Sequence, residues 1–315
     1  MDSPLSPSAD VGSDVPQVKL RTAALSVVSN SALILLKVVA GSLTGSVAIL
    51  TEAVHSSIDL VASVVAVVSV RKAGEPADES HRYGHEKMEN LAAAIEGILI
   101  LVGSATIAFQ AVRHLVGGEH VQRLGIGIGV VAFSMVANLV VSTVIGRNAR
   151  ATSSPALEGD AAHLRTDALT SLAVLVGLSL VAITGAQWLD PVIALTVAAA
   201  IVVTGVRLLA GSSRVLVDEA LPPAQVAAIR DAVEEFGARG VVGYHELRTR
   251  QAGSTRYVDL HVQFRRGTSL EDAHRTAHEL QDVIGARLGG ADVLIHLEPQ
   301  DRVRPGEELR PVGAS

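Results

Sequence analysis

Six apolar stretches, each long enough to cross a lipid bilayer, constrain this chain more than any other feature. They lie at roughly 22–44, 46–70, 90–113, 122–146, 162–184 and 189–210, and the fifth is the least hydrophobic. A helix needs about 20 mostly apolar residues to span the hydrocarbon core, where every backbone polar group must be paired internally. With 49% hydrophobic and only 18% charged residues, the sequence predicts a membrane protein with six transmembrane helices.

The remaining composition limits the chemistry of such a protein. There is no cysteine, so disulfides and thiolate ligands are excluded and any metal site must use His, Asp and Glu. The net charge of −6 offers no broad basic surface for nucleic acid. The 28 glycines, together with many Ser and Ala residues, suit close contact between helices in lipid.

The segments around the apolar stretches predict four regions and an orientation. Residues 1–18 are rich in Ser, Pro and Asp and lack the basic start of a cleaved signal peptide, which indicates a disordered tail. Residues 19–211 form the transmembrane domain, 212–301 a soluble domain and 302–315 a second disordered tail. By the positive-inside rule both termini are cytoplasmic in a multi-pass cell-membrane protein. The basic residues that gather on that side are Lys19, Arg21, Arg71, Lys72, Arg82, Lys87, Arg147, Arg150, Arg165, Arg207 and Arg214.

Residues 212–301 carry the pattern of a small α+β domain. An amphipathic run at 222–237 precedes a stretch, Tyr257–Phe264, in which apolar and polar residues alternate as in a hairpin half-buried on one face. A second helix follows Ser269, with Asp272 at capping-box spacing, and "ADVLIHLEP" closes the domain as a strand. The order αββαβ predicts helices on one face of a three-stranded sheet.

Two matching pairs of polar residues interrupt the apolar stretches. "LTEAVHSSIDLVAS" holds His55 and Asp59, and "HLRTD" holds His163 and Asp167. Residues at i and i+4 share one helix face, so two such helices packed together supply two imidazoles and two carboxylates, a tetrahedral set suited to Zn²⁺. Each residue alone is equally well explained as a polar side chain paired between helices. Two matching pairs favour a metal site, because unpaired polar groups are expensive in a membrane.

The stretches "GSLTGSVAILTEAVHSSIDL", "HRYGHEKMENLAA" and "HLRTDALTSLAVLVG" resemble the cation diffusion facilitators, a family of divalent-metal/proton antiporters. The resemblance covers nearly the whole chain beyond the N-terminal tail. It implies six helices, a cytoplasmic ferredoxin-like domain and a homodimer. It also implies that His55, Asp59, His163 and Asp167 form the transport site, and members with His at the first of these positions tend to select zinc.

The resemblance extends to three further groups. It implies a metal site in the loop "PADESHRYGHEK", although charged loop residues are usually solvated. It implies a metal cluster in the soluble domain, with His274 as a bridge between chains or sites, although each such His alone would more often be an exposed strand residue. Lys87 and Asp218 match a charge pair that holds the dimer together. The implied loop ligands are Asp78, His81 and His85, and the implied cytoplasmic ligands are His245, His261, His296 and Glu298, which stands where Asp is common.

Several polar residues have no assigned role. One group lies within the spans, where its members line an access path, pair with one another or extend toward the interface. His278 follows His274 by one helical turn and has no motif that assigns it a role. Two further histidines flank the outer loop and are interpreted as solvated. The spanning group is Glu52, Asn30, Lys37, Glu96 and Asn138, and the loop histidines are His114 and His120.

These features predict a metal efflux transporter and not an enzyme. We expect a Zn²⁺/H⁺ antiporter that loads zinc from the cytoplasm, since an imidazole cannot easily hold a proton and a zinc ion at once. Efflux of Fe²⁺, Mn²⁺ or Cd²⁺ by the same mechanism is the alternative. A membrane-tethered metal sensor, and an intramembrane zinc enzyme with Glu52 as general base, are the hypotheses from other classes. "HEKME" is no zincin motif, because Glu89 stands where the second His is needed.

Overall fold

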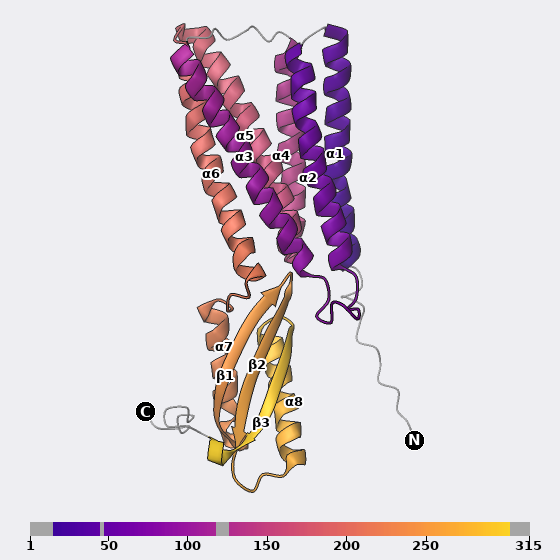
Figure 1. Cartoon of the computed structure of the whole chain (residues 1–315), viewed down its shortest axis with the longest axis vertical. Coiled ribbons are helices and arrows are strands. Elements are labelled where there is room, and N and C mark those ends of the chain that lie inside the picture. The colour runs from indigo at the N-terminus through magenta and orange to yellow at the C-terminus, as the bar shows by residue number, and fades with distance from the viewer. Residues whose placement is uncertain (1–14, 45–46, 118–125, 303–315) are drawn as a thin grey trace. The chain divides into compact units, whose positions relative to one another are not determined.

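The computed structural model describes residues 15–44, 47–117 and 126–302. Within them, the side chains of several residues near the start of the second helix, including His55, lie outside the description. The chain divides into two compact units, Met1–Ser213 and Arg214–Ser315. The first unit is built of long helices, and the second of a small sheet with two helices (Figure 1).

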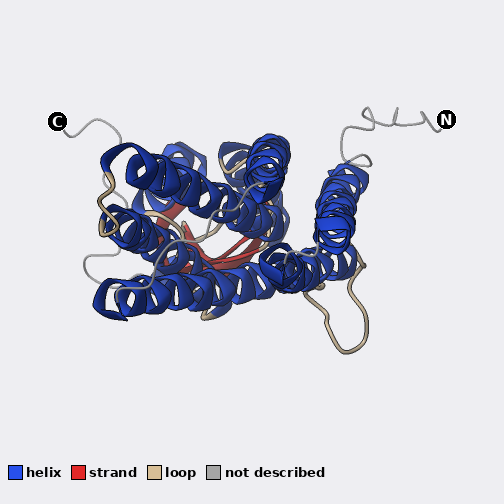
Figure 2. Ribbon diagram, turned by 90° about the horizontal axis from the view of Figure 1, so that it is seen from above, coloured by secondary structure: helices blue, strands red, loops and turns tan. Residues whose placement is uncertain are grey.

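Long helices make up the described part of the first unit, and they run alongside one another (Figures 1 and 2). Five of them, α1 and α3 to α6, are long and apolar enough to cross a membrane. Helix α2 has 27 residues, which corresponds to about 40 Å at 1.5 Å per residue. The helices are α1 (Val15–Thr44), α2 (Val47–Ala73), α3 (Lys87–Gly117), α4 (Ile126–Thr152), α5 (Pro155–Thr184) and α6 (Leu189–Leu216).

Two helices begin earlier than the apolar pattern predicts. Helix α1 starts at Val15, inside the stretch expected to be a disordered tail, and residues 1–14 lie outside the described residues. Helix α5 starts at Pro155, where the Oγ of Ser154 accepts a hydrogen bond from the backbone N–H of Leu157 at 3.4 Å. A serine cap followed by proline in the first turn is a strong helix start. The hydropathy pattern missed that turn because residues 158 and 160 are acidic.

Glycines allow the helices of the first unit to approach closely. A Cβ on Gly97 of α3 would lie 3.0 Å from the backbone nitrogen of Leu209, and one on Gly205 of α6 would lie 2.9 Å from the Cγ of Leu101. Small residues at such contacts favour helix pairing in lipid, where no hydrophobic effect drives it. At these two glycines α3 and α6 approach each other closely.

Buried polar contacts join α1, α3 and α5 near the points where these helices begin. The Nζ of Lys19 donates to Glu89 Oε1 at 2.8 Å, and the Oγ of Ser154 donates to Glu89 Oε2. All three side chains are buried. A buried charge that keeps its partners is tolerated, whereas one that loses them is strongly destabilising. This cluster fixes the start of α5 against α3.

The second unit has the predicted αββαβ order. Strands β1 and β2 pair antiparallel, β2 and β3 pair parallel, and the sheet order is β1-β2-β3. The Oγ of Ser269 accepts from the backbone N–H of Asp272 at 3.1 Å, so the predicted cap is confirmed. The elements are α7 (Pro223–Glu235), a 3₁₀ turn (Phe236–Arg239), β1 (Val241–Ala252), β2 (Thr255–Phe264), α8 (Leu270–Arg287), β3 (Ala291–Pro299) and a second 3₁₀ turn (Gln300–Arg302).

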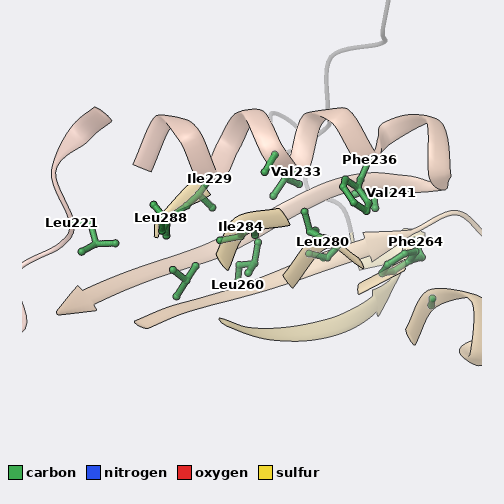
Figure 3. Close-up of a cluster of buried hydrophobic side chains, with 14 residues drawn as sticks. Leu221, Ile229, Val233, Phe236, Val241, Leu260, Phe264, Leu280, Ile284 and Leu288 are labelled. Carbon is green, nitrogen blue, oxygen red and sulfur yellow. The ribbon is translucent and has the colours of Figure 1, made fainter. Parts of the chain in front are cut away.

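Helices α7 and α8 supply the apolar core against one face of this sheet, as Figure 3 shows. The alternating side chains of β2 that were expected to face inward are buried. Each fully buried aliphatic side chain contributes about 1.5–3 kcal/mol relative to an exposed one, so the second unit has a core of its own. Its central members are Ile229, Val233, Leu260, Leu280 and Ile284.

Candidate metal sites

Helices α2 and α5 bring three of the four predicted transport ligands together. The Nε2 of His163 lies 3.2 Å from Asp59 Oδ1 and 3.9 Å from Asp167 Oδ2. Asp59 and His163 are buried, and Asp167 is partly buried. One ligand atom from each residue lies within 4.8 Å of the others, a spacing at which a single metal ion can contact all three. The side chain of His55, the fourth predicted ligand, lies outside the described residues.

A polar cavity of about 40 Å³ reaches the two carboxylates of this cluster. On α1 its lining comes from the second half of the helix, at Asn30, Leu33 and Lys37. A volume of this size admits water molecules. Three of the intramembrane polar residues of unassigned role, Asn30, Lys37 and Asn138, line it, and Lys37 donates from Nζ to Ser56 Oγ at 2.7 Å. The lining residues are Asn30, Leu33, Lys37, Ser56, Asp59, Ser134, Asn138, Asp167, Thr170 and Ser171.

Hydrogen bonds join polar side chains of α1, α2 and α5 beside the cluster, although Asp160 Oδ2 has no partner among the described residues. Ser26 donates to Asp160 Oδ1 at 2.8 Å, and the Nδ2 of Asn30 donates to Ser63 Oγ at 2.7 Å. The hydroxyls of Ser26 and Ser63 lie 2.9 Å apart. This network packs the three helices closely between the cluster and the ends at which α1 and α5 begin. Asp160 was missed by sequence reasoning, because it precedes the apolar stretch that was counted as the span.

The loop between α2 and α3 assembles the second predicted group. The Nδ1 of His81 lies 3.3 Å from Asp78 Oδ1, and the Nε2 of His85 lies 3.3 Å from Asp78 Oδ2. The backbone N–H of His81, followed by that of Ser80, holds the pKa of Asp78 below its usual value. His85 is buried, and neither of its ring nitrogens has a hydrogen-bond partner among the described residues. A buried imidazole with open nitrogens and a carboxylate within reach suits a divalent cation.

Strand register aligns the histidines of the second unit. His245 of β1 pairs with His261 of β2, and His261 pairs with His296 of β3, so three imidazoles form a row across the sheet. Because Glu298 follows His296 by two residues, it lies on the same face. Its Oε2 lies 2.8 Å from His245 Nε2, and its Oε1 lies 3.0 Å from His261 Nδ1. Glutamate at this position therefore reaches two of the predicted ligands.

The carboxylate of Glu298 is held by these two imidazoles. The hydrogen bond from His245 is the largest effect that lowers the pKa of Glu298, to about 2, and the bond from His261 adds to it. The Nε2 of His296 is more distant, at 3.9 Å from Glu298 Oε1, and its side chain is exposed. His245, His261 and Glu298 form the compact set, with ligand atoms within 4.8 Å of one another. Two imidazoles and a carboxylate suit zinc, so the residues present fit that metal.

A β-bulge adds a carboxylate that sequence reasoning missed. The register between β1 and β2 shifts between His245 and Arg248, and Glu246 has a positive φ of 48°. In a regular strand Glu246 would point away from the face that carries His245. The bulge turns it back, so its Oε2 lies 3.5 Å from His261 Nε2. No pattern in the sequence marks this bulge.

Other predicted residues are placed without being joined to a cluster. His274 lies on α8, where its Nε2 is 3.1 Å from that of His278, and both side chains are exposed. Its role as a bridge stays a prediction. Lys87 is the first residue of α3, in the first unit. Asp218 and Arg250 both belong to the second unit, where Asp218 Oδ1 lies 3.7 Å from Arg250 Nη1. The proposed interlock between them stays a prediction as well.

His114, which flanks the outer loop and was expected to be solvated, is partly buried. It lies in the last turn of α3, with its Nδ1 3.6 Å from Asp190 Oδ2 of α6. Both residues line a cavity of about 230 Å³ between α3, α5 and α6. In the sequence, an acidic residue at the start of one span and a histidine at the end of another could have suggested this pair. His120 lies outside the described residues.

Two family models match the chain in consecutive blocks. Residues 23–217 match the cation efflux transmembrane domain, and residues 221–300 match the cytoplasmic domain of cation efflux proteins. The first block alone covers more than half of the sequence and includes the intramembrane and loop clusters. The second contains the cluster on the sheet. These boundaries follow the division into a helical unit and a sheet unit.

Whole-chain relatives agree with the family models. An uncharacterized transporter of Synechocystis is 35% identical over 84% of this chain and 85% of its own. The cation-efflux pump FieF of Serratia proteamaculans is 34% identical over 89% of this chain and 92% of its own. A solved structure of the transporter CzrB in its zinc form is 34% identical, with a TM-score of 0.26, and covers 28% of this chain and 98% of its own. The chain therefore belongs to the cation efflux family, the cation diffusion facilitators, and is a multi-pass membrane transporter rather than an enzyme.

Proposed function

We propose that this transporter exports Zn²⁺ from the cytoplasm in exchange for protons. The observation that carries the proposal is the buried cluster of Asp59, His163 and Asp167, which lies between two helices that a membrane protein would otherwise keep apolar. Ionisable groups inside a membrane domain mark a substrate or proton pathway by default. The family accounts for the transport of a cation, and the donor set of the cluster supports zinc as that cation.

Zinc is favoured over harder cations by the presence of imidazole among the ligands. Carboxylate and water ligands suit Mg²⁺, Ca²⁺ and Mn²⁺, whereas imidazole suits zinc and its neighbours in the transition series. His55 would add a second imidazole and complete a tetrahedral set with His163 and the two aspartates. Efflux of Fe²⁺, Mn²⁺ or Cd²⁺ by the same cycle is the alternative, and it predicts a different rate order among metals.

Proton exchange follows from the chemistry of the same ligands. A histidine nitrogen that binds zinc must first lose its proton, so arriving protons displace the metal and metal displaces protons. The cavity next to Asp59 and Asp167 is lined on α1 by residues in the second half of that helix. With both termini in the cytoplasm, that half lies nearer the outer side. This placement supports alternating access, in which the site opens to the outer side in one conformation and to the cytoplasm in another.

The sheet unit and the loop complete the proposal. We expect His245, His261 and Glu298 to hold a resident zinc ion, with His296 contributing from the exposed side, and His274 on α8 to bridge chains or sites. We expect the loop ligands Asp78, His81 and His85 to bind a further ion, and the protein to function as a homodimer held in part by Lys87 and Asp218. The close geometry of both clusters within one chain supports these sites.

Vesicles containing the purified protein test the function directly. With a zinc-sensitive dye inside and the sheet unit facing outward, external zinc should enter faster when the interior is acidic than when the pH is equal on both sides. Collapse of the pH gradient with a protonophore should abolish the acceleration. Parallel runs with Fe²⁺, Mn²⁺ and Cd²⁺ rank the substrates.

Two outcomes would contradict the proposal in different ways. Zinc entry that is insensitive to the pH gradient would remove proton exchange while leaving efflux. No entry of any divalent metal, in vesicles where the sheet unit still binds zinc, would favour a membrane-tethered sensor. Release of a chemically altered substrate is the result that the enzyme hypothesis requires, and no such product is expected.

A further inference from the structure

Glu96 is a buried acid that the transport site, as described so far, does not use. It lies on α3 with none of its surface exposed. Neither carboxylate oxygen has a hydrogen-bond partner among the described residues. A fully buried carboxylate without a hydrogen bond is among the most expensive groups a protein can bury. Its presence calls for a function that an apolar residue of the same size would not provide.

The carboxylate of Glu96 lies beside the imidazole of His163. Glu96 Oε2 lies 3.5 Å from His163 Nδ1. The other ring nitrogen, Nε2, faces Asp59 and Asp167 at 3.2 and 3.9 Å. The ring thus stands between two kinds of carboxylate, with one nitrogen toward the ligand cluster and the other toward Glu96. Like the Glu96 oxygens, Nδ1 has no hydrogen-bond partner among the described residues.

The packing of α3 on α5 builds this contact. A Cβ on Gly159 would lie 3.1 Å from both the Cβ and the Cγ of Glu96, and 3.2 Å from the Cα of Ala93. Gly159 precedes His163 by four residues, so both lie on the same face of α5. The absence of a side chain at 159 makes room for the stem of the glutamate beside the histidine.

We propose that Glu96 is a positioning residue for the transport site. When the site holds its cation, the Glu96 carboxylate accepts the Nδ1–H of His163, which selects the tautomer whose Nε2 lone pair faces the transported cation. A neutral imidazole carries one ring proton, and the nitrogen without it is the one that binds metal. Carboxylates that hold the second nitrogen of a metal-binding histidine fix its orientation and raise its basicity as a ligand. This inference rests on the proposed transport site, of which His163 is a member.

Variants at Glu96 separate positioning from structural support. Glu96→Gln keeps an acceptor oxygen but loses the charge, and Glu96→Leu loses both. In vesicles we expect the apparent KM for zinc to rise about tenfold in Glu96→Gln and about 100-fold in Glu96→Leu, the range found for outer-shell partners of metal ligands. The melting temperature in chelator should change little in Glu96→Leu, because the cost of leaving His163 Nδ1 without an acceptor is offset by the removal of a buried carboxylate.

Glu89 provides the matched control. It is a buried glutamate on the same helix, two turns before Glu96, but its carboxylate is bonded to Lys19 and Ser154. Glu89→Gln should lower the melting temperature and leave the KM for zinc within about twofold. A wild-type KM for zinc in Glu96→Leu would overturn the proposal. A loss of transport in that variant that is accounted for by a lower melting temperature would overturn it as well.

A spectroscopic readout tests the tautomer without reference to flux. In zinc-loaded full-length protein labelled with ¹⁵N-histidine, the signal of His163, identified by its loss in His163→Gln, should show Nε2 bound to metal and Nδ1 protonated. Metal bound through Nδ1 would overturn the positioning role of Glu96. A His163 signal that does not respond to zinc at all would instead refute the proposed transport site. The experiment thus distinguishes a failure of the positioning role from a failure of the transport site.

Discussion

The cluster between α2 and α5 and the cluster on the sheet use the same ligand types, but the hydrogen bonding of these ligands differs. On the sheet, both oxygens of Glu298 accept from imidazoles at 2.8 and 3.0 Å. Between the helices, His163 has one nitrogen near two carboxylates and the other near Glu96, and several polar atoms have no partner among the described residues. The carboxylate of the first set has both oxygens hydrogen-bonded, whereas buried polar atoms of the second set lack such bonds among the described residues.

This difference fits a division between holding a metal and moving one. A carboxylate already bonded to two histidines is preorganised, so binding a resident ion costs little rearrangement. Buried groups without partners are unstable in any single arrangement, which favours exchange of occupants such as a cation and protons. We therefore expect substitutions in the helical cluster to change flux and substitutions in the sheet cluster to change stability and assembly.

The largest effect should come from the helical cluster. Asp167→Ala is expected to lower zinc flux more than about 100-fold, because a direct ligand matters more than the outer-shell groups worth 10–100-fold. Insertion into the membrane should be preserved, since the substitution removes a charge. The measurement is zinc uptake by vesicles with equal protein content, with Glu298→Ala as the control expected to retain flux. Near-normal flux in Asp167→Ala would break the division between the two clusters.

Selectivity should change by a smaller factor. His55→Asp replaces a nitrogen donor by oxygen and is expected to raise the Cd²⁺ and Mn²⁺ rates relative to zinc on the order of tenfold. Competition between metals in the same vesicles gives the ratio directly. If the ratio in His55→Asp equals that of the wild-type protein, His55 does not set selectivity.

The sheet cluster should respond through stability. For a fragment of residues 212–301, zinc at about 100 times its Kd adds about 2.7 kcal/mol, or roughly 10–20 °C in Tm for a domain of this size. It should also shift the fragment toward dimer in sedimentation. His261→Ala should remove most of both effects, whereas His278→Ala, an exposed histidine outside the cluster, should retain the gain in Tm. Equal zinc responses in wild type and His261→Ala would show that the row of histidines is only a surface feature.

The smallest effect is expected at the bulge. Glu246 is about half exposed and lies 3.5 Å from His261, so its charge should contribute less than about 1 kcal/mol. Glu246→Gln should weaken zinc binding to the fragment by less than about fivefold, as measured by competition with an indicator dye. A loss of zinc affinity of more than tenfold would identify Glu246 as a direct ligand. The sheet cluster would then hold two carboxylates, as the helical cluster does.

Much of the architecture could be predicted from local pattern. The five helices that meet the length and hydropathy of a span, the αββαβ order and the Ser269 cap all follow from periodicity and composition within short windows. The loop triad Asp78, His81 and His85 could also be found, because its members lie within eight residues and a turn is enough to assemble them. Such features depend on neighbours in the chain.

The sequence by itself determined which residue types are available to each site: two His-x-x-x-Asp pairs, a His-rich loop and histidines on strands, with no cysteine. Tertiary structure decided which of them meet and with whom. The strand register placed His245, His261 and His296 in one row, a bulge turned Glu246 toward them, and the approach of α3 to α5 over Gly159 set Glu96 beside His163. These contacts join residues 15 to 67 positions apart, and their geometry depends on helix packing and strand pairing, which local periodicity does not encode.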